Sequence, residues 1–125
     1  MNLTQIRTKA KELEAKFDTL YDDTIDLIPV SNKKLKDALA DQIDLQLQWG
    51  TLSKSISHVY DMCEVEVESE YAGSVSKELR DSYKTTTITE AKEYAKASKE
   101  YQEAKRVLVD LKLLRDNARE VYEVV

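Results

Sequence analysis

Residues 87–125 of the chain read TITEAKEYAKASKEYQEAKRVLVDLKLLRDNAREVYEVV, a stretch without glycine or proline. Apolar residues recur in it at steps of three and four, the spacing that places side chains on one face of an α-helix. This stripe comprises Ala91, Tyr94, Ala97, Tyr101, Ala104, Leu108, Leu111, Ala118, Val121 and Val125. The stretch predicts one helix over residues 88–123, roughly 55 Å long at about 1.5 Å per residue.

A small compact domain is shorter than this stripe and cannot cover all of it. Other helices of the same chain, or other copies of the chain, must therefore bury it. We predict an all-α protein whose long helices form a helical hairpin or bundle and assemble into a ring-like homo-oligomer. The predicted oligomer interface consists of six residues from the apolar stripes: Leu13, Phe17, Leu20, Tyr101, Leu108 and Leu111.

Composition supports a single helical domain over residues 1–125. The chain is 42% hydrophobic and 34% charged, with two glycines and one proline, which is typical of long helices and coiled coils. A lone cysteine, Cys63, excludes an intrachain disulfide. No apolar run approaches the roughly 18 residues that a membrane helix needs, so we expect a cytoplasmic protein without membrane contact.

The first predicted helix covers residues 3–28. Its apolar positions alternate at steps of three and four for nearly four heptads, which favours pairing with one or two partner helices. Asn2 and Thr4 are both candidate N-caps, and Pro29 ends the pattern because proline cannot continue a helix. The heptad positions are Leu3, Ile6, Ala10, Leu13, Phe17, Leu20, Thr24 and Leu27.

The second predicted helix covers residues 32–71, and either Ser31 or Asn32 caps it. Gly50 lies inside it, which indicates a kink or the close approach of another helix. Alternation over residues 64–70 resembles a strand, but we favour a helix that ends before Gly73, with a joint over residues 72–86. The stripe includes Leu35, Ala38, Leu39, Leu45, Trp49, Leu52, Ile56, Val59, Cys63 and Val67.

Catalytic chemistry has little support in the sequence. The chain lacks the common phosphate-binding and metal-binding motifs, and we predict no enzyme activity, no cofactor and no metal site. His58 is the sole histidine, and its spacing from Ser55 permits a contact on one helix. That spacing is common by chance, so a surface or seam-edge histidine is the favoured interpretation.

Basic residues offer a more specific signal. Residues 84–119 hold nine cations and six anions inside a chain of net charge −5. They form either an ordinary solubilising surface or a groove that follows the phosphates of single-stranded DNA, which a ring of subunits would strengthen through multivalency. The candidate DNA-binding residues form two clusters, Lys77, Arg80 and Lys84, and Lys33, Lys34 and Lys36.

Tyrosines gather near the predicted joint, with Trp49 upstream. Aromatic rings beside basic residues can stack unpaired bases, but tyrosines at helical spacing also fill the space between helices. Both interpretations stay open for Tyr60, Tyr71 and Tyr83. The glutamates of residues 64–70 are either a solvated face or an acidic surface for a basic partner.

The order of several short motifs resembles the UvsY family of phage recombination mediators. Ile28-Pro29 is followed by Asn32-Lys33-Lys34-Leu35, and a long helix then closes on Glu70-Tyr71-Ala72-Gly73. Next come a short polar joint, Tyr83-Lys84-Thr85-Thr86 and a long charged helix. The resemblance covers roughly residues 27–120, and it is carried by the order and lengths of the elements.

That resemblance implies an all-helical, ring-shaped homo-oligomer in the host cytoplasm. It further implies that the protein binds single-stranded DNA and helps a RecA-like recombinase displace single-strand-binding protein. The family's DNA contacts involve basic residues before the Tyr-x-Gly end, but residues 63–71 contain no lysine or arginine here. Either the other cations contact DNA, or the chain shares the architecture alone and is a structural or adaptor coiled coil for phage virion or complex assembly.

Overall fold

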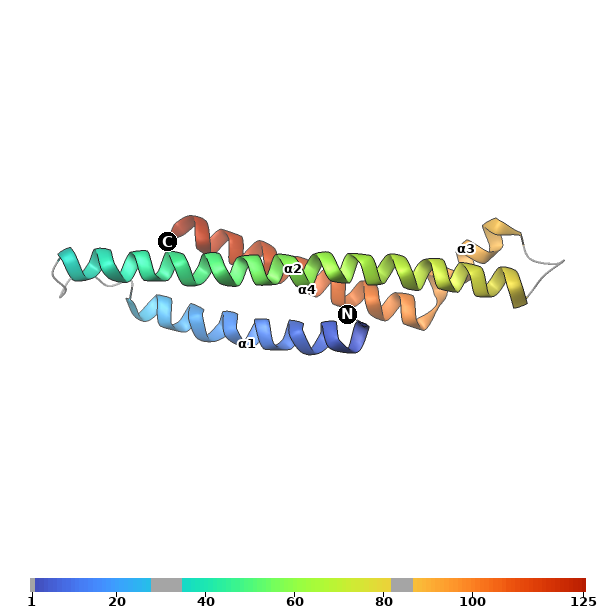
Figure 1. Ribbon diagram of the computed structural model, residues 1–125, viewed down its shortest axis with the longest axis horizontal. Coiled ribbons are helices and arrows are strands. Elements are labelled where there is room, and N and C mark those ends of the chain that lie inside the picture. The colour runs from blue at the N-terminus through green and yellow to red at the C-terminus, as the bar shows by residue number, and fades with distance from the viewer. Residues whose placement is uncertain (1, 28–34, 82–86) are drawn as a thin grey trace.

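The computed structural model describes residues 2–27, 35–81 and 87–125, and these residues confirm the predicted all-α fold. The described helices are α1 (Leu3–Leu27), α2 (Leu35–Asp81), α3 (Ile88–Ala97) and α4 (Lys99–Val124). α2 has 47 residues and extends along most of the molecule. α1 and α4 lie against α2 and run antiparallel to it (Figure 1). None of the described helices is long and apolar enough to cross a membrane.

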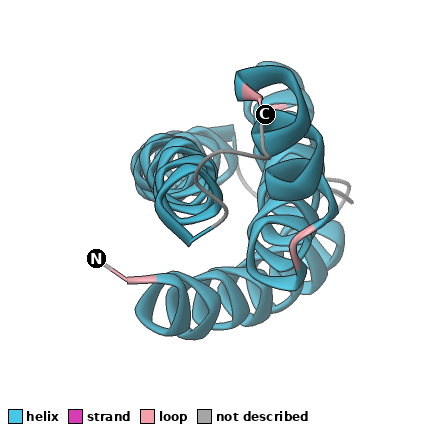
Figure 2. Cartoon of the chain, turned by 90° about the vertical axis from the view of Figure 1, so that its right-hand side faces the viewer, coloured by secondary structure: helices cyan, strands magenta, loops and turns pink. Residues whose placement is uncertain are grey.

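The three long helices pack around one continuous apolar core. Viewed end-on, α1, α2 and α4 surround a shared axis (Figure 2). α2 contributes more buried side chains than any other described helix, and they are spaced at three and four residues as the sequence predicts. The buried core comprises Ile6, Leu13, Leu45, Trp49, Leu52, Ile56, Val59, Cys63, Val67, Ala104, Leu111 and Ala118.

α1 begins with a reciprocal capping box. The side-chain Oδ1 of Asn2 accepts a hydrogen bond from the Gln5 backbone N–H at 2.9 Å, and Gln5 Oε1 accepts one from the Asn2 N–H at 3.0 Å. Of the two candidate caps, the cap is therefore Asn2. α1 ends at Leu27, and Pro29 lies outside the described residues.

α2 continues through most of the predicted joint, which corrects the expected end at residue 71. Gly73 lies within the helix and has no left-handed backbone. The physical reason is packing, because α3 lies against α2 and buries Ala91 and Ala95 there. This contact favours helical continuation beyond Gly73, at the cost of about 1 kcal/mol that glycine carries in a helix.

The long C-terminal helix predicted over residues 88–123 is interrupted at Ser98. Thr87 caps α3, since its Oγ1 accepts a hydrogen bond from the Glu90 N–H at 3.2 Å. Ser98 has an extended backbone with φ −65° and ψ 142°, and its Oγ accepts a hydrogen bond from the Tyr101 N–H at 3.2 Å. Ser98 thus ends one helix and caps the next.

This interruption changes which residues face the core. In α3 the buried residues are Ala91 and Ala95, and Tyr94 and Ala97 of the predicted stripe are exposed. In α4 the predicted stripe holds, with Ala104, Leu111 and Ala118 buried. The break at Ser98 therefore divides the apolar stripe that the sequence predicts into two faces, one on α3 and one on α4.

Gly50 allows the close approach of α4. A Cβ atom at this position would lie 3.2 Å from Cε2 of Tyr122. The end of α4 is also held by hydrogen bonds, because the backbone carbonyl of Val125 accepts one from Gln42 Nε2 at 3.0 Å and one from Gln46 Nε2 at 2.9 Å. Of the two explanations for this glycine, the structure shows close approach.

Candidate nucleic-acid and assembly surfaces

The six residues predicted to form an oligomer interface lie in the chain's own core. Leu13 and Leu111 are buried there. The other four, Phe17, Leu20, Tyr101 and Leu108, are partly buried and pack against the core. Helices of the same chain thus cover most of the stripes, which was one of the two alternatives that the sequence left open.

Only part of the predicted DNA-binding set is described. Lys77 and Arg80 are exposed in the last turns of α2, three residues apart, so they share one side of the helix. Lys36 belongs to the first turn of α2. Lys33, Lys34 and Lys84 lie outside the described residues. Among the described residues, Lys36 therefore lies at the opposite end of α2 from Lys77 and Arg80.

A hollow between α2 and α4 collects aromatic and charged side chains. Its volume is about 440 Å³. The ring centroids of Tyr71 and Tyr101 lie 5.6 Å apart, and Lys105 Nζ lies 5.8 Å from the centroid of the Tyr101 ring. We call this site the tyrosine hollow, and it is lined by Tyr60, Glu64, Val67, Glu68, Tyr71, Lys96, Tyr101, Lys105 and Leu108.

Helical spacing explains how these residues meet. Tyr60, Val67 and Tyr71 follow steps of seven and four along α2, and Tyr101, Lys105 and Leu108 follow steps of four and three along α4. Because the two helices run antiparallel and pack closely, these two rows face each other. Lys96 joins them from the end of α3.

At the other end of the tyrosine hollow, Tyr60 lies between opposite charges. The guanidinium of Arg115 lies over its ring, with Cζ 4.1 Å from the centroid, a cation–π contact. A hydrogen bond to Glu64 is the main reason that the pKa of Tyr60 is raised, and burial adds to it, although Arg115 acts in the opposite direction. These contacts tie α4 to α2 at this position.

Charge in the tyrosine hollow is balanced. Lys96 and Lys105 contribute two cations, and Glu64 and Glu68 contribute two anions. α2 as a whole is acidic, with ten carboxylates against four basic residues. Anionic ligands are therefore favoured at the edge formed by α3 and α4, and disfavoured along α2.

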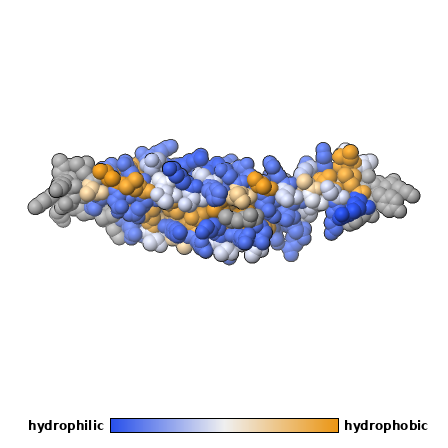
Figure 3. Space-filling view, in the orientation of Figure 1, coloured by the Kyte–Doolittle hydropathy of each residue, from blue (hydrophilic) through white to orange (hydrophobic). Residues whose placement is uncertain are grey.

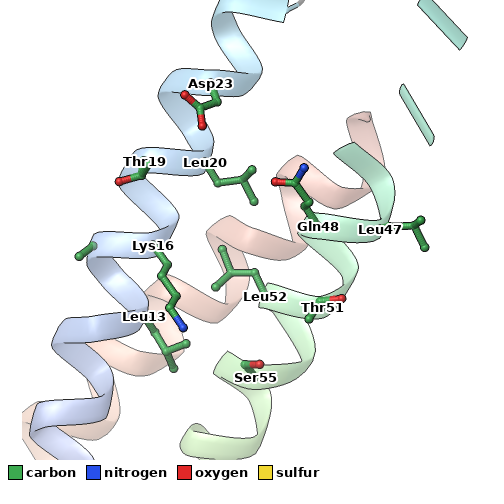
Figure 4. Close-up of a pocket in the computed structure, with 11 residues that line it drawn as sticks. Leu13, Lys16, Thr19, Leu20, Asp23, Leu47, Gln48, Thr51, Leu52 and Ser55 are labelled. Carbon is green, nitrogen blue, oxygen red and sulfur yellow. The ribbon is translucent and has the colours of Figure 1, made fainter. Parts of the chain in front are cut away.

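A second concave surface lies between α1 and α2, and we call it the α1–α2 groove. Its volume is about 640 Å³, and leucines from both helices point into it or lie at its edge (Figure 4). Lys16 and Asp23 stand along α1, and Gln48 and Thr51 stand along α2. The four leucines are Leu13, Leu20, Leu47 and Leu52.

The surface elsewhere is mostly polar. Figure 3 shows hydrophilic residues over most of the visible face, with hydrophobic residues gathered in separate patches between them. His58 is exposed, and the Cys63 thiol is fully buried, with its pKa raised to about 11 by burial. In the described part of the chain, no cluster of histidine, cysteine or carboxylate side chains could hold a metal ion.

Sequence reasoning missed the partners of the tyrosines. It grouped Tyr60 and Tyr71 with Trp49 and Tyr83, but Trp49 is buried in the core and Tyr83 lies outside the described residues. Tyr101 comes from a helix whose alignment with α2 has no local sequence signal.

Comparisons of the chain with protein-family models, with curated proteins and with solved structures find no match. The resemblance to the UvsY family therefore stays a hypothesis based on the order of motifs.

Proposed function

We propose that this chain is a non-enzymatic recombination mediator that binds single-stranded DNA and helps load a RecA-like recombinase. The observation that supports it is the tyrosine hollow, where the rings of Tyr71 and Tyr101 stand beside the amines of Lys96 and Lys105. Rings beside cations are the arrangement that binds unpaired bases without sequence preference. The roles of a recombinase and of single-strand-binding protein rest on the resemblance to UvsY proteins.

The balance of charges sets the expected strength of binding. Stacking on an aromatic ring contributes about 1–3 kcal/mol per base, whereas Glu64 and Glu68 oppose a phosphate nearby. Binding by one subunit is therefore weak. Assembly into a ring-like homo-oligomer, which belongs to this proposal, would bring several such sites to one strand and raise the overall affinity.

Fluorescence anisotropy of a labelled oligothymidylate of about 20 nucleotides tests the proposal. We expect binding at low salt that weakens steeply as salt rises, because bound cations release counterions from the phosphates. Lys96→Glu combined with Lys105→Glu should weaken binding at least tenfold. No anisotropy change at low salt would refute DNA binding.

A matched control uses the exposed lysine Lys54 of α2. Lys54→Glu introduces the same kind of charge change outside the tyrosine hollow. Lys54→Glu should weaken binding much less than Lys96→Glu alone or Lys105→Glu alone. Equal effects would mean that net charge alone governs binding, and they would reject the tyrosine hollow as the site.

The second candidate function is that of a structural or adaptor protein that binds only protein. The specific observation in its favour is the apolar α1–α2 groove, which the described helices leave uncovered. In that case the oligonucleotide experiment gives no binding at any salt concentration, whereas assembly still depends on the α1–α2 groove.

A further inference from the structure

The α1–α2 groove has the features of a surface for another helix. α4 covers the opposite side of the α1–α2 pair, so the three long helices form a bundle that is open on one side. Leu47 at its edge is 66% exposed. Leu13 and Leu52 are already buried within the chain, so a complex would be stabilised by burial of Leu47 and of the half-buried Leu20.

Charges along α1 indicate what covers the groove. Lys16 and Asp23 are both exposed, line the groove, and lie seven residues apart, which is two helical turns on one face. Leu20 lies between them. If two copies meet face to face with α1 antiparallel to α1 and a two-fold axis near Leu20, each Lys16 lies opposite the other copy's Asp23.

We propose that the α1–α2 groove is covered by the same groove of a second copy, in an antiparallel dimer with a two-fold axis. One interface residue pair then occurs twice, as symmetry requires. In a parallel dimer, each α1 would face α2 of the other copy. Lys16 would then not lie opposite Asp23. This inference rests on the proposed function in one respect, because it describes how the homo-oligomer of that proposal begins to assemble.

An isologous contact closes after two copies, so a ring with more copies needs a further surface. The dimer is thus the unit from which a larger particle would be built. DNA binding at the tyrosine hollow lies on other residues, so assembly and DNA binding are measured independently.

Charge reversal tests the antiparallel arrangement by sedimentation equilibrium without DNA. Asp23→Lys alone and Lys16→Asp alone each place like charges opposite each other at two points, and each should raise the dimer dissociation constant about tenfold. The double variant carrying both changes restores the unlike pairs and should return to within about twofold of the starting protein. A double variant weaker than both single variants would overturn the proposal.

Leu47→Glu tests the apolar part of the contact. The side chain is mostly exposed in one copy, so the variant keeps its fold, and a charge buried in the dimer should weaken it at least a hundredfold. Val65→Glu is the matched control, because Val65 is 62% exposed, lies eighteen residues or five turns along the same face of α2, and does not line the groove.

Val65→Glu should leave the dissociation constant unchanged. A starting protein that stays monomeric at about 100 µM would overturn the dimer, and so would a Leu47→Glu variant that dimerises normally. Either result would overturn the dimer alone, because the oligonucleotide measurement tests DNA binding separately.

Discussion

The indole N–H of Trp49 on α2 donates a hydrogen bond to the hydroxyl Oγ1 of Thr24 on α1, at 2.8 Å and out of contact with water. The same hydroxyl donates to the backbone carbonyl of Leu20 at 2.7 Å. A polar residue thus occupies an apolar heptad position because the one tryptophan of the chain needs an acceptor there. This bond fixes α1 lengthwise against α2.

Thr24→Val should therefore destabilise the fold by about 1–3 kcal/mol, since it leaves the indole N–H buried without a partner. Denaturant unfolding followed by Trp49 fluorescence measures the change. Thr24→Ser keeps the hydroxyl and should cost less. If valine and serine destabilise equally, the hydrogen bond contributes nothing and the loss comes from packing alone.

Leu111 is the α4 residue whose truncation should cost most. It is 1% exposed, and Leu111→Ala should lower the free energy of unfolding by about 2–5 kcal/mol through loss of burial and creation of a cavity. Unfolding in urea tests this. Leu113→Ala is the control on the same helix, because Leu113 is 63% exposed, and it should cost under about 1 kcal/mol.

The two glycines of α2 should respond differently to alanine. Gly73→Ala should stabilise the protein by about 1 kcal/mol, because the site is helical and nothing lies within 4 Å of the added Cβ. Gly50→Ala should gain less, since its Cβ meets Tyr122 at 3.2 Å. Thermal unfolding of both variants checks the order, and a destabilising Gly73→Ala would mean that α2 ends near residue 71.

Cys63 should make stability fall at high pH. Burial raises the pKa of its thiol to about 11 from an ordinary value of 9.0, so the folded protein holds this proton longer than the unfolded chain. The stability that this difference contributes is complete below pH 9 and is lost as pH rises through 11. Urea unfolding at about pH 8 and about pH 10 measures the loss.

Cys63→Ala removes the titrating group and serves as the control. Tyrosines and lysines also titrate in this range, so the informative quantity is the difference between the two proteins. The starting protein should lose more stability between the two pH values than Cys63→Ala does. Equal losses would show that the thiol does not contribute.

Much of the fold could be predicted from local pattern. The heptad of α1 and the stripe of α2 between Leu45 and Val67 have the correct faces, because burial of one face imposes a period that is readable in sequence. The Thr87 cap was equally readable. Each of these features depends on residues within a few turns of one another.

The features that could not be predicted from the sequence depend on contacts between distant segments. Gly73 has the residue type of a helix end, and only the packing of α3 against α2 explains why the helix continues. Ser98 was hidden in a stretch of good helix formers. The tyrosine hollow needed the alignment of Tyr71 with Tyr101, which follows from how the antiparallel helices pack rather than from any motif.

The central claim is that one chain buries its own apolar stripes, and that the dimer contact lies at its surface, in the α1–α2 groove. The most direct test is the urea midpoint of Leu47→Glu, followed by Trp49 fluorescence at two protein concentrations about a hundredfold apart. The account predicts one cooperative transition with the same midpoint at both concentrations. A midpoint that rises with concentration, or a variant already unfolded without urea, would show that the core is shared between copies and would contradict the account.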